Sequence, residues 1–600
     1  MVGREAQGER ADRSFLSRLA RDTGGNTLAI VGASLLPLLA MMGSGIDLTR
    51  TYMAHARLQQ ACDAAALAGR RVMSGGVVNQ TVTDEARKFF NFNFPQATWG
   101  TAAFTPSITQ GPDSTVVVAA STTIPTQIMR LFGFTTLPLD VTCDAKQDFV
   151  NTDIVLVLDT TGSMDQDVNG TDVNGGPSSK IVALRAAVLA LYDELTPVQT
   201  KLEAAGLRLR YSIVPFSSGM NVGAILKSVN PNYIVSDNYT YQSRIAKYAH
   251  SETGTTASYC SGKGGSRSNS GTCTYTDNNP SGGTFASWTY QPMTYPVTDY
   301  VNTLSASGAT LGTVNTPAQN TTVTPYGIYA KLTYPAPIAA TSSWKGCIEE
   351  RQTVSTITGS SGYTIPSDAW DLDIDMIPNG NNATKWAPYW PEVEFRADGV
   401  DQDAYQRYYW ENYRSFPGYN SKPQVACPAP ATRLQVWSRA TLSTYLDTLT
   451  PDGGTYHDNG MIWGARLLSR GGIFAADNPA TYGSMPVSRQ VIYMTDGIID
   501  TGATLYHTYG MEKWDKRVTG GYTTDADSDA RHDQRFKMMC AATKQMGVSI
   551  WVIAFASTLS DSLKSCATSE AQASVSANSA QLTAKFVEIG KSIGALRLTQ

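Results

Sequence analysis

The sequence lacks the short motifs that accompany the common catalytic chemistries. It contains no HExxH zinc-protease motif, no GxSxG nucleophile turn, no phosphate-binding GxxxxGK loop and no GxGxxG segment after a strand. These absences leave metalloprotease, hydrolase, NTPase and dehydrogenase functions without a motif to support them. We therefore expect a protein that is not an enzyme.

Runs of basic residues and zinc-type cysteine motifs are missing as well. The formal net charge is −4, and residues of both signs are spread along the chain, so no patch of lysine and arginine is available to follow a phosphate backbone. We therefore expect no nucleic-acid partner. The eight cysteines form no CxxC pair and no Cys/His cluster with zinc spacing, so disulfides explain them better.

The positions of the cysteines indicate an oxidising compartment. Cys260 and Cys273 enclose a short loop rich in glycine and serine, of the kind that a disulfide closes. A bridge is also expected between Cys540 and Cys566, which flank a predicted strand, with two separate buried thiols as the alternative.

Charged residues are absent from one stretch that is long enough to cross a bilayer as a helix. The segment 27–46, TLAIVGASLLPLLAMMGSGI, is the only one of its kind in the sequence. Basic residues are concentrated before it and fewer after it, so the positive-inside rule places the tail 1–26 in the cytoplasm. The arginines of this tail are Arg4, Arg10, Arg13, Arg18 and Arg21.

A cleaved signal peptide is the rival interpretation of this segment. No small-x-small cleavage site directly follows the apolar run, and the run is longer than the core of a usual signal peptide. Gly32 and Pro37 would be unfavourable in a buried helix of a soluble protein but are tolerated in a membrane span. We therefore predict an uncleaved transmembrane helix over 27–46 and export of everything that follows it.

A small membrane-proximal domain of helix and sheet is predicted over 47–150. Its first part, DLTRTYMAHARLQQACDAAALAGRRVM, is rich in Ala, Leu, Gln and Arg and continues the membrane helix as an amphipathic one. Two later segments, STVVVAASTTIP and LPLDVTCDAKQDF, alternate as strands do, with MRLFGF between them. Cys62 and Cys143 fall in this domain, and both a disulfide and separate free thiols stay open for them.

At Asn151 the pattern changes to apolar strands that alternate with helices. TDIVLVLDTTGSM is a buried strand that ends in a polar loop, and KIVALRAAVLALYDEL follows with helical periodicity. RLRYSIVPFSS, RQVIYMTDG and GVSIWVIAFAS supply three more strands. This alternation predicts an α/β fold with a doubly wound, mostly parallel sheet over 151–600.

A long insertion interrupts this alternation between 230 and 432. Gly, Ser, Thr, Tyr, Trp and Pro dominate the segment, which is too long for an ordinary loop. Its aromatic residues and its four cysteines, which include Cys347 and Cys427, argue against disorder. We therefore expect an inserted subdomain with disulfides. Helical periodicity returns at RLQVWSRATLSTYLDTL.

Polar residues gather where an open α/β sheet binds its ligands, in the loops at the carboxyl ends of the strands. The first strand runs into Asp159, Thr161 and Ser163; Thr455 precedes a helix, and Asp496 ends another strand. Two carboxylates and three hydroxyls, without imidazole or thiolate, suit a hard cation, Mg²⁺ above all, with Mn²⁺ and Ca²⁺ as alternatives. With so few carboxylates bound, the ion can accept an acidic oxygen from another molecule.

His457, two residues after Thr455, is the one histidine that the sequence places near this candidate site. It is not paired with a serine or cysteine nucleophile, so we expect a loop residue and not a catalytic base. Without a general base, the candidate site is suited to binding.

The pattern Asp159-x-Thr161-x-Ser163 with Thr455 and Asp496 resembles the metal-ion-dependent adhesion site of von Willebrand factor A domains, which have a Rossmann-like fold. The resemblance implies that Thr161 and Ser163 ligate the ion directly and that Thr455 joins or leaves its shell. It also implies that the two aspartates act largely through water. Many members of that family have Asp-Ser-Ser where this chain has Asp-Thr-Ser, a change that keeps the hydroxyl.

Nearly the whole chain resembles the TadG-like proteins of Tad (Flp) pilus assembly. Gly25-Asn26 before the span carries the resemblance, together with LQQACDAAALAG, DTTGSM, GGTYHDNGMIWGARLL and the closing LRLTQ. It implies a bacterial inner-membrane protein with its bulk in the periplasm that contributes to the assembly or anchoring of an adhesive pilus. Processed pilins usually carry Glu five residues after the cleaved glycine, and here that position is Ile30, which argues against cleavage.

These features support two different functions. In the first, the bound ion accepts an acidic residue of a protein partner in the pilus-assembly machinery or the envelope. In the second, the A domain is a structural scaffold or a surface adhesin, and the insertion makes the functional contacts in place of the metal.

Overall fold

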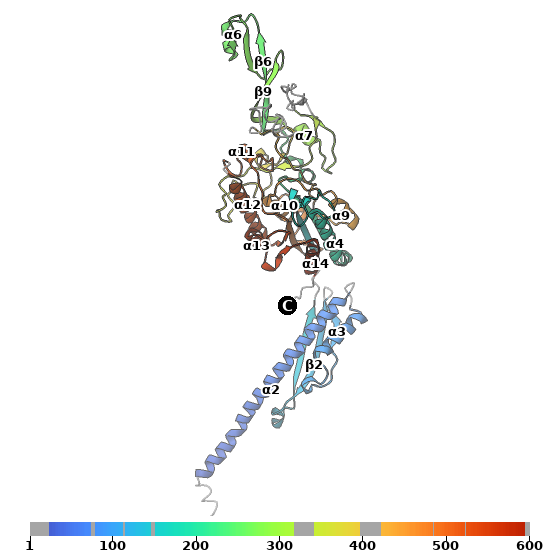
Figure 1. The fold of residues 1–600 in the computed structure, drawn as a ribbon. Coiled ribbons are helices and arrows are strands. Elements are labelled where there is room, and N and C mark those ends of the chain that lie inside the picture. Colours follow the sequence, from blue (N-terminus) through green and yellow to red (C-terminus); the bar gives the residue numbers. More distant parts are fainter. Residues whose placement is uncertain are drawn as a thin grey trace, which may run out of the picture. The chain divides into compact units, whose positions relative to one another are not determined.

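The structure is a computed structural model that describes residues 23–73, 78–111, 115–145, 151–316, 341–396, 422–483, 485–521 and 524–594. Most of the predicted cytoplasmic tail, with its arginines, and the closing LRLTQ lie outside these residues. The chain divides between Phe149 and Val150 into two compact units, each with a hydrophobic core of its own. Figure 1 shows the elements of both units.

The N-terminal unit is built on one long helix, α2 (Thr23–Val72). The large apolar side chains in its first part are exposed: Ile30 exposes 68% of its surface and Leu36 60%. Among the described residues, this is the one helix that is long and apolar enough to cross a membrane. The apolar segment and the amphipathic segment predicted to follow it thus form a single helix (Figure 1).

A second helix and a three-stranded antiparallel sheet pack on the later half of α2. Residues of β2 and β3 alternate between buried and less buried positions, as the sequence pattern predicted. A disulfide joins Cys62 on α2 to Cys143 on β3, which decides between the two possibilities for these cysteines. The elements are α3 (Gln80–Asn93), β1 (Ser107–Gln110), β2 (Val116–Pro125) and β3 (Thr136–Ala145).

The larger unit contains the predicted parallel sheet. Its main strands run in the order β17-β16-β15-β4-β5, and each neighbouring pair in this order is parallel. Every residue of β4 is buried, so both faces of the centre of the sheet are covered. The strands are β4 (Asn151–Asp159), β5 (Leu209–Phe216), β15 (Met485–Thr495), β16 (Ser549–Phe555) and β17 (Ala573–Ser576); β14 (Thr481–Tyr482) pairs antiparallel with β15.

Helices connect these strands, because a parallel pair needs a crossover that returns the chain to the starting edge. α4 follows β4 and packs on α14, and α12 connects β15 with β16. A disulfide between Cys540 and Cys566 ties α12 to α13, as predicted. The helices are α4 (Lys180–Ala204), α10 (His457–Leu468), α12 (Asp525–Gln545), α13 (Asp561–Cys566) and α14 (Ser579–Gly594).

The helix predicted at RLQVWSRATLSTYLDTL is shorter than its periodicity indicated. Only α9 (Arg439–Leu446) is helical. The residues before it are extended, because Gln435 and Tyr211 exchange two backbone hydrogen bonds of 2.9 and 3.0 Å at the edge of β5. Ser438 then caps α9 by accepting the N–H of Thr441.

The segment between β5 and β15 carries an antiparallel sheet of its own. Its four strands run in the order β7-β8-β6-β9, and the Cys260–Cys273 disulfide, predicted from the loop composition, links α6 (Ala257–Gly262) to β8. The strands are β6 (Asn238–Glu252), β7 (Ser266–Arg267), β8 (Cys273–Asp277) and β9 (Thr284–Pro296). Figure 1 shows β6 and β9 extending away from the helices around the parallel sheet.

The base of this segment is not a separate unit. Tyr241, Trp344 and Trp390 belong to the same buried core as Val157 and Phe216 of the parallel sheet. The described part of the expected insertion therefore shares one core with the sheet, which composition alone did not indicate.

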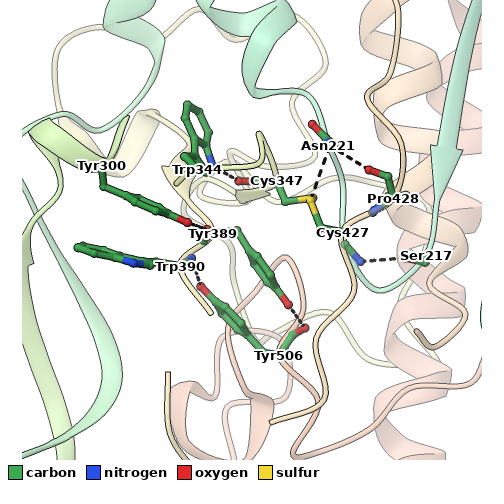
Figure 2. Close-up of a disulfide and its surroundings, with 11 residues drawn as sticks. Ser217, Asn221, Tyr300, Trp344, Cys347, Tyr389, Trp390, Cys427, Pro428 and Tyr506 are labelled. Atoms are coloured by element: carbon green, nitrogen blue, oxygen red, sulfur yellow. Dashed lines mark hydrogen bonds between the residues drawn. A yellow bond between two sulfur atoms is a disulfide. The ribbon is translucent and has the colours of Figure 1, made fainter. Parts of the chain in front are cut away.

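The fourth disulfide, between Cys347 and Cys427, lies in an aromatic cluster at this base (Figure 2). Asn221, in the loop after β5, donates a hydrogen bond of 2.9 Å to the carbonyl of Pro428. The rings of Tyr389 and Tyr506 stack with their centroids 3.9 Å apart. The disulfide and the cluster thus tie the segment to the loops that leave both β5 and β15.

The close approach of α10 to the sheet depends on glycine. A Cβ built on Gly460 would lie 2.7 Å from a ring carbon of Phe216 and 2.8 Å from Cγ1 of Val157. We predict that Gly460→Ala lowers the free energy of unfolding by about 1–3 kcal/mol, because the added methyl overpacks this contact. Unfolding of the full chain in detergent measures the change.

Gly262→Ala is the matched control, because a Cβ at Gly262 on α6 meets no atom within 4 Å. Its effect should stay within about 0.5 kcal/mol. Equal effects of the two substitutions would contradict the proposed role of Gly460.

Candidate metal centre

Two loops of the parallel sheet bring four of the five predicted residues together. β4 ends at Asp159, and the N–H of Thr161 donates a hydrogen bond of 2.8 Å to its carboxylate. Ser163 Oγ donates to Asp496 Oδ1 over 2.8 Å and lies 3.1 Å from Thr161 Oγ1. A continuous set of polar contacts therefore joins the loop after β4 to the end of β15.

Thr455 reaches the same place from the loop before α10. It exchanges two backbone hydrogen bonds, of 2.9 and 3.1 Å, with Asp500 in the loop after β15. A Cβ built on Gly497 would lie 3.7 Å from Thr455 Oγ1 and 3.9 Å from Ser163 Oγ. Both hydroxyls thus face the same glycine, and all five predicted residues lie at one edge of the sheet.

The two carboxylates share a buried position. Asp159 is fully buried and Asp496 exposes 4% of its surface. Burial and, second, the charge of Asp496 raise the pKa of Asp159 to about 7, although hydrogen bonds from Thr495 and Thr161 lower it. Two negative charges held together away from water are costly, and a divalent cation would reduce that cost.

The oxygen donors of this site fit a divalent cation. Across the described ranges, no three or more His, Cys, Asp or Glu side chains gather where they could hold a metal ion. The candidate site is of another kind, because three of its five donors are the hydroxyls of Thr161, Ser163 and Thr455. When bound, a cation would supply positive charge with coordination positions left open. The protein residues fix where that charge lies.

Thr495 hydrogen-bonds to Asp159, and His457 in turn contacts Thr495. The sequence did not indicate either role. Thr495 Oγ1 donates to Asp159 Oδ2 over 2.6 Å. That hydroxyl has one proton, so His457 Nε2, 3.2 Å away, is the donor in its contact with Thr495. The expectation that His457 is a loop residue is wrong: it begins α10 and is buried, and burial lowers its pKa to about 4.

Lys180 is the second residue that the sequence did not indicate. Its Nζ lies 2.8 Å from Asp496 Oδ2, and neither side chain exposes more than 6% of its surface. The lysine begins α4, and nothing in the sequence distinguishes it from an ordinary solvated residue of a first helical turn. It places one fixed positive charge beside the two carboxylates, so it neutralises part of their charge.

One side of the candidate site is open to solvent. Gly162 is exposed, while Ser163 and Gly497 are half-buried. Ile498 exposes 67% of its surface only two residues after Asp496. An approaching molecule would therefore meet an apolar side chain beside the oxygen donors.

The segment between β5 and β15 also approaches this edge. The N–H of Gly162 donates to the carbonyl of Gly453 over 3.0 Å. A Cβ on Gly453 would lie 2.6 Å from Cβ of Ala426, the neighbour of Cys427. The Cys347–Cys427 disulfide therefore holds part of this segment next to the candidate site.

A family model described as "Putative Flp pilus-assembly TadE/G-like" matches residues 25–77. The match includes most of α2 and extends a few residues past its end. The family is one of pilus assembly and indicates a structural or assembly role, with no catalytic activity in its description. No curated protein matches the chain.

Solved structures show weak likeness only. The pilus adhesin SpaC from Lactobacillus rhamnosus GG is 11% identical with a TM-score of 0.27, covering 82% of this chain and 33% of its own. The vWF domain of the type V pili tip protein Mfa5 from Porphyromonas gingivalis is 17% identical (TM-score 0.19; 29% of this chain, 80% of its own). The mussel byssus protein PTMP1 with a zinc-occupied MIDAS motif is 18% identical, with a TM-score of 0.17. The match covers 28% of this chain and 35% of PTMP1. This chain thus spans about a third of SpaC.

Lys180→Met tests how the fixed charge and a bound cation share Asp496. We predict that the variant is less stable than the wild type without divalent cations, by about 3–5 kcal/mol, because Asp496 loses a buried ion partner. Mg²⁺ should then stabilise the variant more than the wild type. Thermal unfolding of the full chain with and without Mg²⁺ measures both effects.

Lys201→Met on the same helix is the control, since Lys201 is exposed and lies near the end of α4. It should respond to Mg²⁺ as the wild type does. A Lys180→Met protein whose Mg²⁺ response equals that of the control would show that the lysine and the cation do not share Asp496.

Proposed function

We propose that this chain is a membrane-anchored, non-enzymatic protein of Tad (Flp) pilus assembly or anchoring that binds a protein partner through a divalent cation. The unit from Asn151 onward would be a von Willebrand factor A domain, interrupted by the segment 230–432. Its cation, Mg²⁺ in the first instance, would be held by the five oxygen donors and would accept an acidic side chain of the partner. The TadE/G-like match over 25–77 supports the pilus assignment.

The observation that carries this proposal is the convergence of the five donors at the open edge of a parallel sheet. Asp159 and Asp496 are buried and their charge is only partly neutralised, while Ser163 Oγ contacts both Thr161 Oγ1 and Asp496, and Gly162 next to it is exposed. A cation would stabilise the two carboxylates of such a site and would keep coordination positions open for a ligand from another molecule. Direct ligation by the hydroxyls, and aspartates acting through water, would fit this geometry.

The membrane part of the proposal depends on α2. Its apolar segment 27–46 would cross a bacterial inner membrane once, with 1–26 in the cytoplasm and the remainder in the periplasm. The four disulfides agree with this side of the membrane, because they form in oxidising compartments. The residues 47–150 would form the membrane-proximal domain.

Asp159→Ala tests the metal step. We expect Mg²⁺ to raise the melting temperature of the wild type and to leave that of the variant unchanged, because the carboxylate that organises the loop after β4 is gone. Asp561→Ala is the control, since this aspartate is fully exposed on α13 and should not alter the Mg²⁺ response. Equal stabilisation of Asp159→Ala and the wild type would contradict the proposed site.

A second candidate function assigns the partner contacts to the antiparallel sheet β7-β8-β6-β9. Its favouring observation is that the outer part of this sheet buries little: its own small cluster consists of Cys260, Cys273 and Tyr275. Most residues of β9 are at least partly exposed. A protruding, disulfide-closed hairpin of this kind is available to a partner without any metal.

Trimming this hairpin separates the two candidates. Ala249 and Thr284 are opposite each other in the β6–β9 pair, so an Asn-Gly turn can replace 250–283 and leave the shared core intact. We predict that partner capture from solubilised membranes survives the trimming and is lost on chelation with EDTA. Capture that fails after trimming but resists EDTA would favour the hairpin as the binding element.

A further inference from the structure

The turn between β2 and β3 presents large apolar side chains to solvent. The turn η3 (Met129–Phe132) and the residues after it connect the two strands. Leu131 exposes 78% of its surface, Phe134 59% and Phe132 36%. Three such residues within four positions are an unusual concentration for a surface loop of a soluble domain.

Asp47 of α2 is hydrogen-bonded to the backbone of this turn. Its carboxylate accepts the backbone N–H groups of Gln127, Ile128 and Met129 over 2.8, 3.0 and 2.8 Å. Asp47 exposes only 2% of its surface. Because charge-assisted hydrogen bonds to three successive N–H groups fix both position and orientation, the turn is held rigidly on the helix.

Gly43, one helical turn before Asp47, brings the two segments close together. It is buried, and a Cβ at this position would lie 2.4 Å from Cγ2 of Ile128. The turn therefore packs on α2 at Gly43 and Asp47. Figure 1 shows the end of the β2–β3 hairpin beside the middle of α2, toward the N-terminal half of the helix.

The docking position coincides with the end of the apolar part of α2. The large apolar side chains from Ile30 to Leu48 expose between 48% and 68% of their surface. Arg50 begins the polar part and donates hydrogen bonds to the carbonyls of Trp99 and Pro125. The turn that carries these exposed residues thus docks on α2 at the level where the predicted span ends.

We infer that Leu131, Phe132 and Phe134 insert into the interfacial region of the same bilayer that α2 crosses. Transfer of leucine and phenylalanine side chains from water to this region of the bilayer is favourable in free energy. The backbone of the turn tolerates a less polar environment, because Asp47 satisfies three of its N–H groups and the N–H of Phe134 donates to Met129. Arg130, directly before Leu131, is exposed and can contact lipid phosphates.

This second contact with the bilayer rests on the proposed membrane anchoring and adds a property to it. A single helix fixes depth but leaves rotation about its axis free. The turn is bonded to one side of α2 by Asp47. If it is also inserted in the membrane, α2 can no longer rotate about its axis. The membrane-proximal domain would then hold one orientation on the bilayer.

Site-specific fluorescence tests the inference in the full chain. All eight native cysteines are in disulfides, so an added exposed cysteine is the one thiol available for labelling. Leu131→Cys, Leu36→Cys and Phe92→Cys would each be labelled with the fluorophore NBD and reconstituted in phosphatidylcholine vesicles. Phe92, 81% exposed on α3, is the matched control, because α3 packs on the later half of α2.

We expect nitroxide-labelled lipids to quench the probe at Leu131 strongly when the nitroxide is shallow, and aqueous iodide to quench it several-fold less than the probe at Phe92. A probe at Leu131 that iodide reaches as readily as the probe at Phe92 would overturn the inference. So would a probe shielded from both quenchers, which would indicate that a second copy of the chain covers the turn.

The probe at Leu36 separates this inference from the membrane anchoring. Quenching at Leu36 by deep nitroxides, without shallow quenching at Leu131, overturns the insertion of the turn and leaves the anchoring in place. Absence of quenching at Leu36 overturns the anchoring and the inference together. Asp47→Ala adds a further check: it should expose the probe at Leu131 to iodide while Leu36 stays quenched.

Discussion

The burial of Asp159 next to Asp496 is the constraint on which the candidate site depends. Parallel strands end at the same edge, so the register of β4 and β15 places these two carboxylates close together. The surrounding groups reduce the cost of that proximity: Thr495 donates to one carboxylate, and Lys180 and Ser163 contact the other. This neutralisation is partial, and a divalent cation would complete it.

Much of the framework was predictable from the sequence, because apolar strands and amphipathic helices have strong periodic signals. The strands around Asp159 and Asp496, the apolar N-terminal helix and the Cys260–Cys273 disulfide follow from such local patterns. The five candidate donors were found in the same way, because they lie at the end of a strand, in the loop after it, or just before a helix. Their role as metal ligands is still a prediction.

Features that depend on contacts between distant segments could not be read from the sequence. Lys180 has no local mark that separates it from a solvated lysine, and its role appears only when Asp496 is folded beside it. His457 looked like a loop residue, but packing of α10 against the sheet buries it behind Thr495. The composition of the segment 230–432 likewise gave no sign that Trp344 and Trp390 belong to the core of the parallel sheet.

The Cys62–Cys143 disulfide gives the N-terminal unit a mechanical property. It bonds α2 covalently to β3, the last strand before the larger unit begins at Val150. Tension applied to the chain beyond β3 would pass through two sulfur atoms directly into α2. The residues between the two cysteines, with β1, β2 and α3 among them, could not be extended by that tension while the disulfide is intact. A protein that holds a partner against a pull could therefore transmit the force to its helix without unfolding the small sheet.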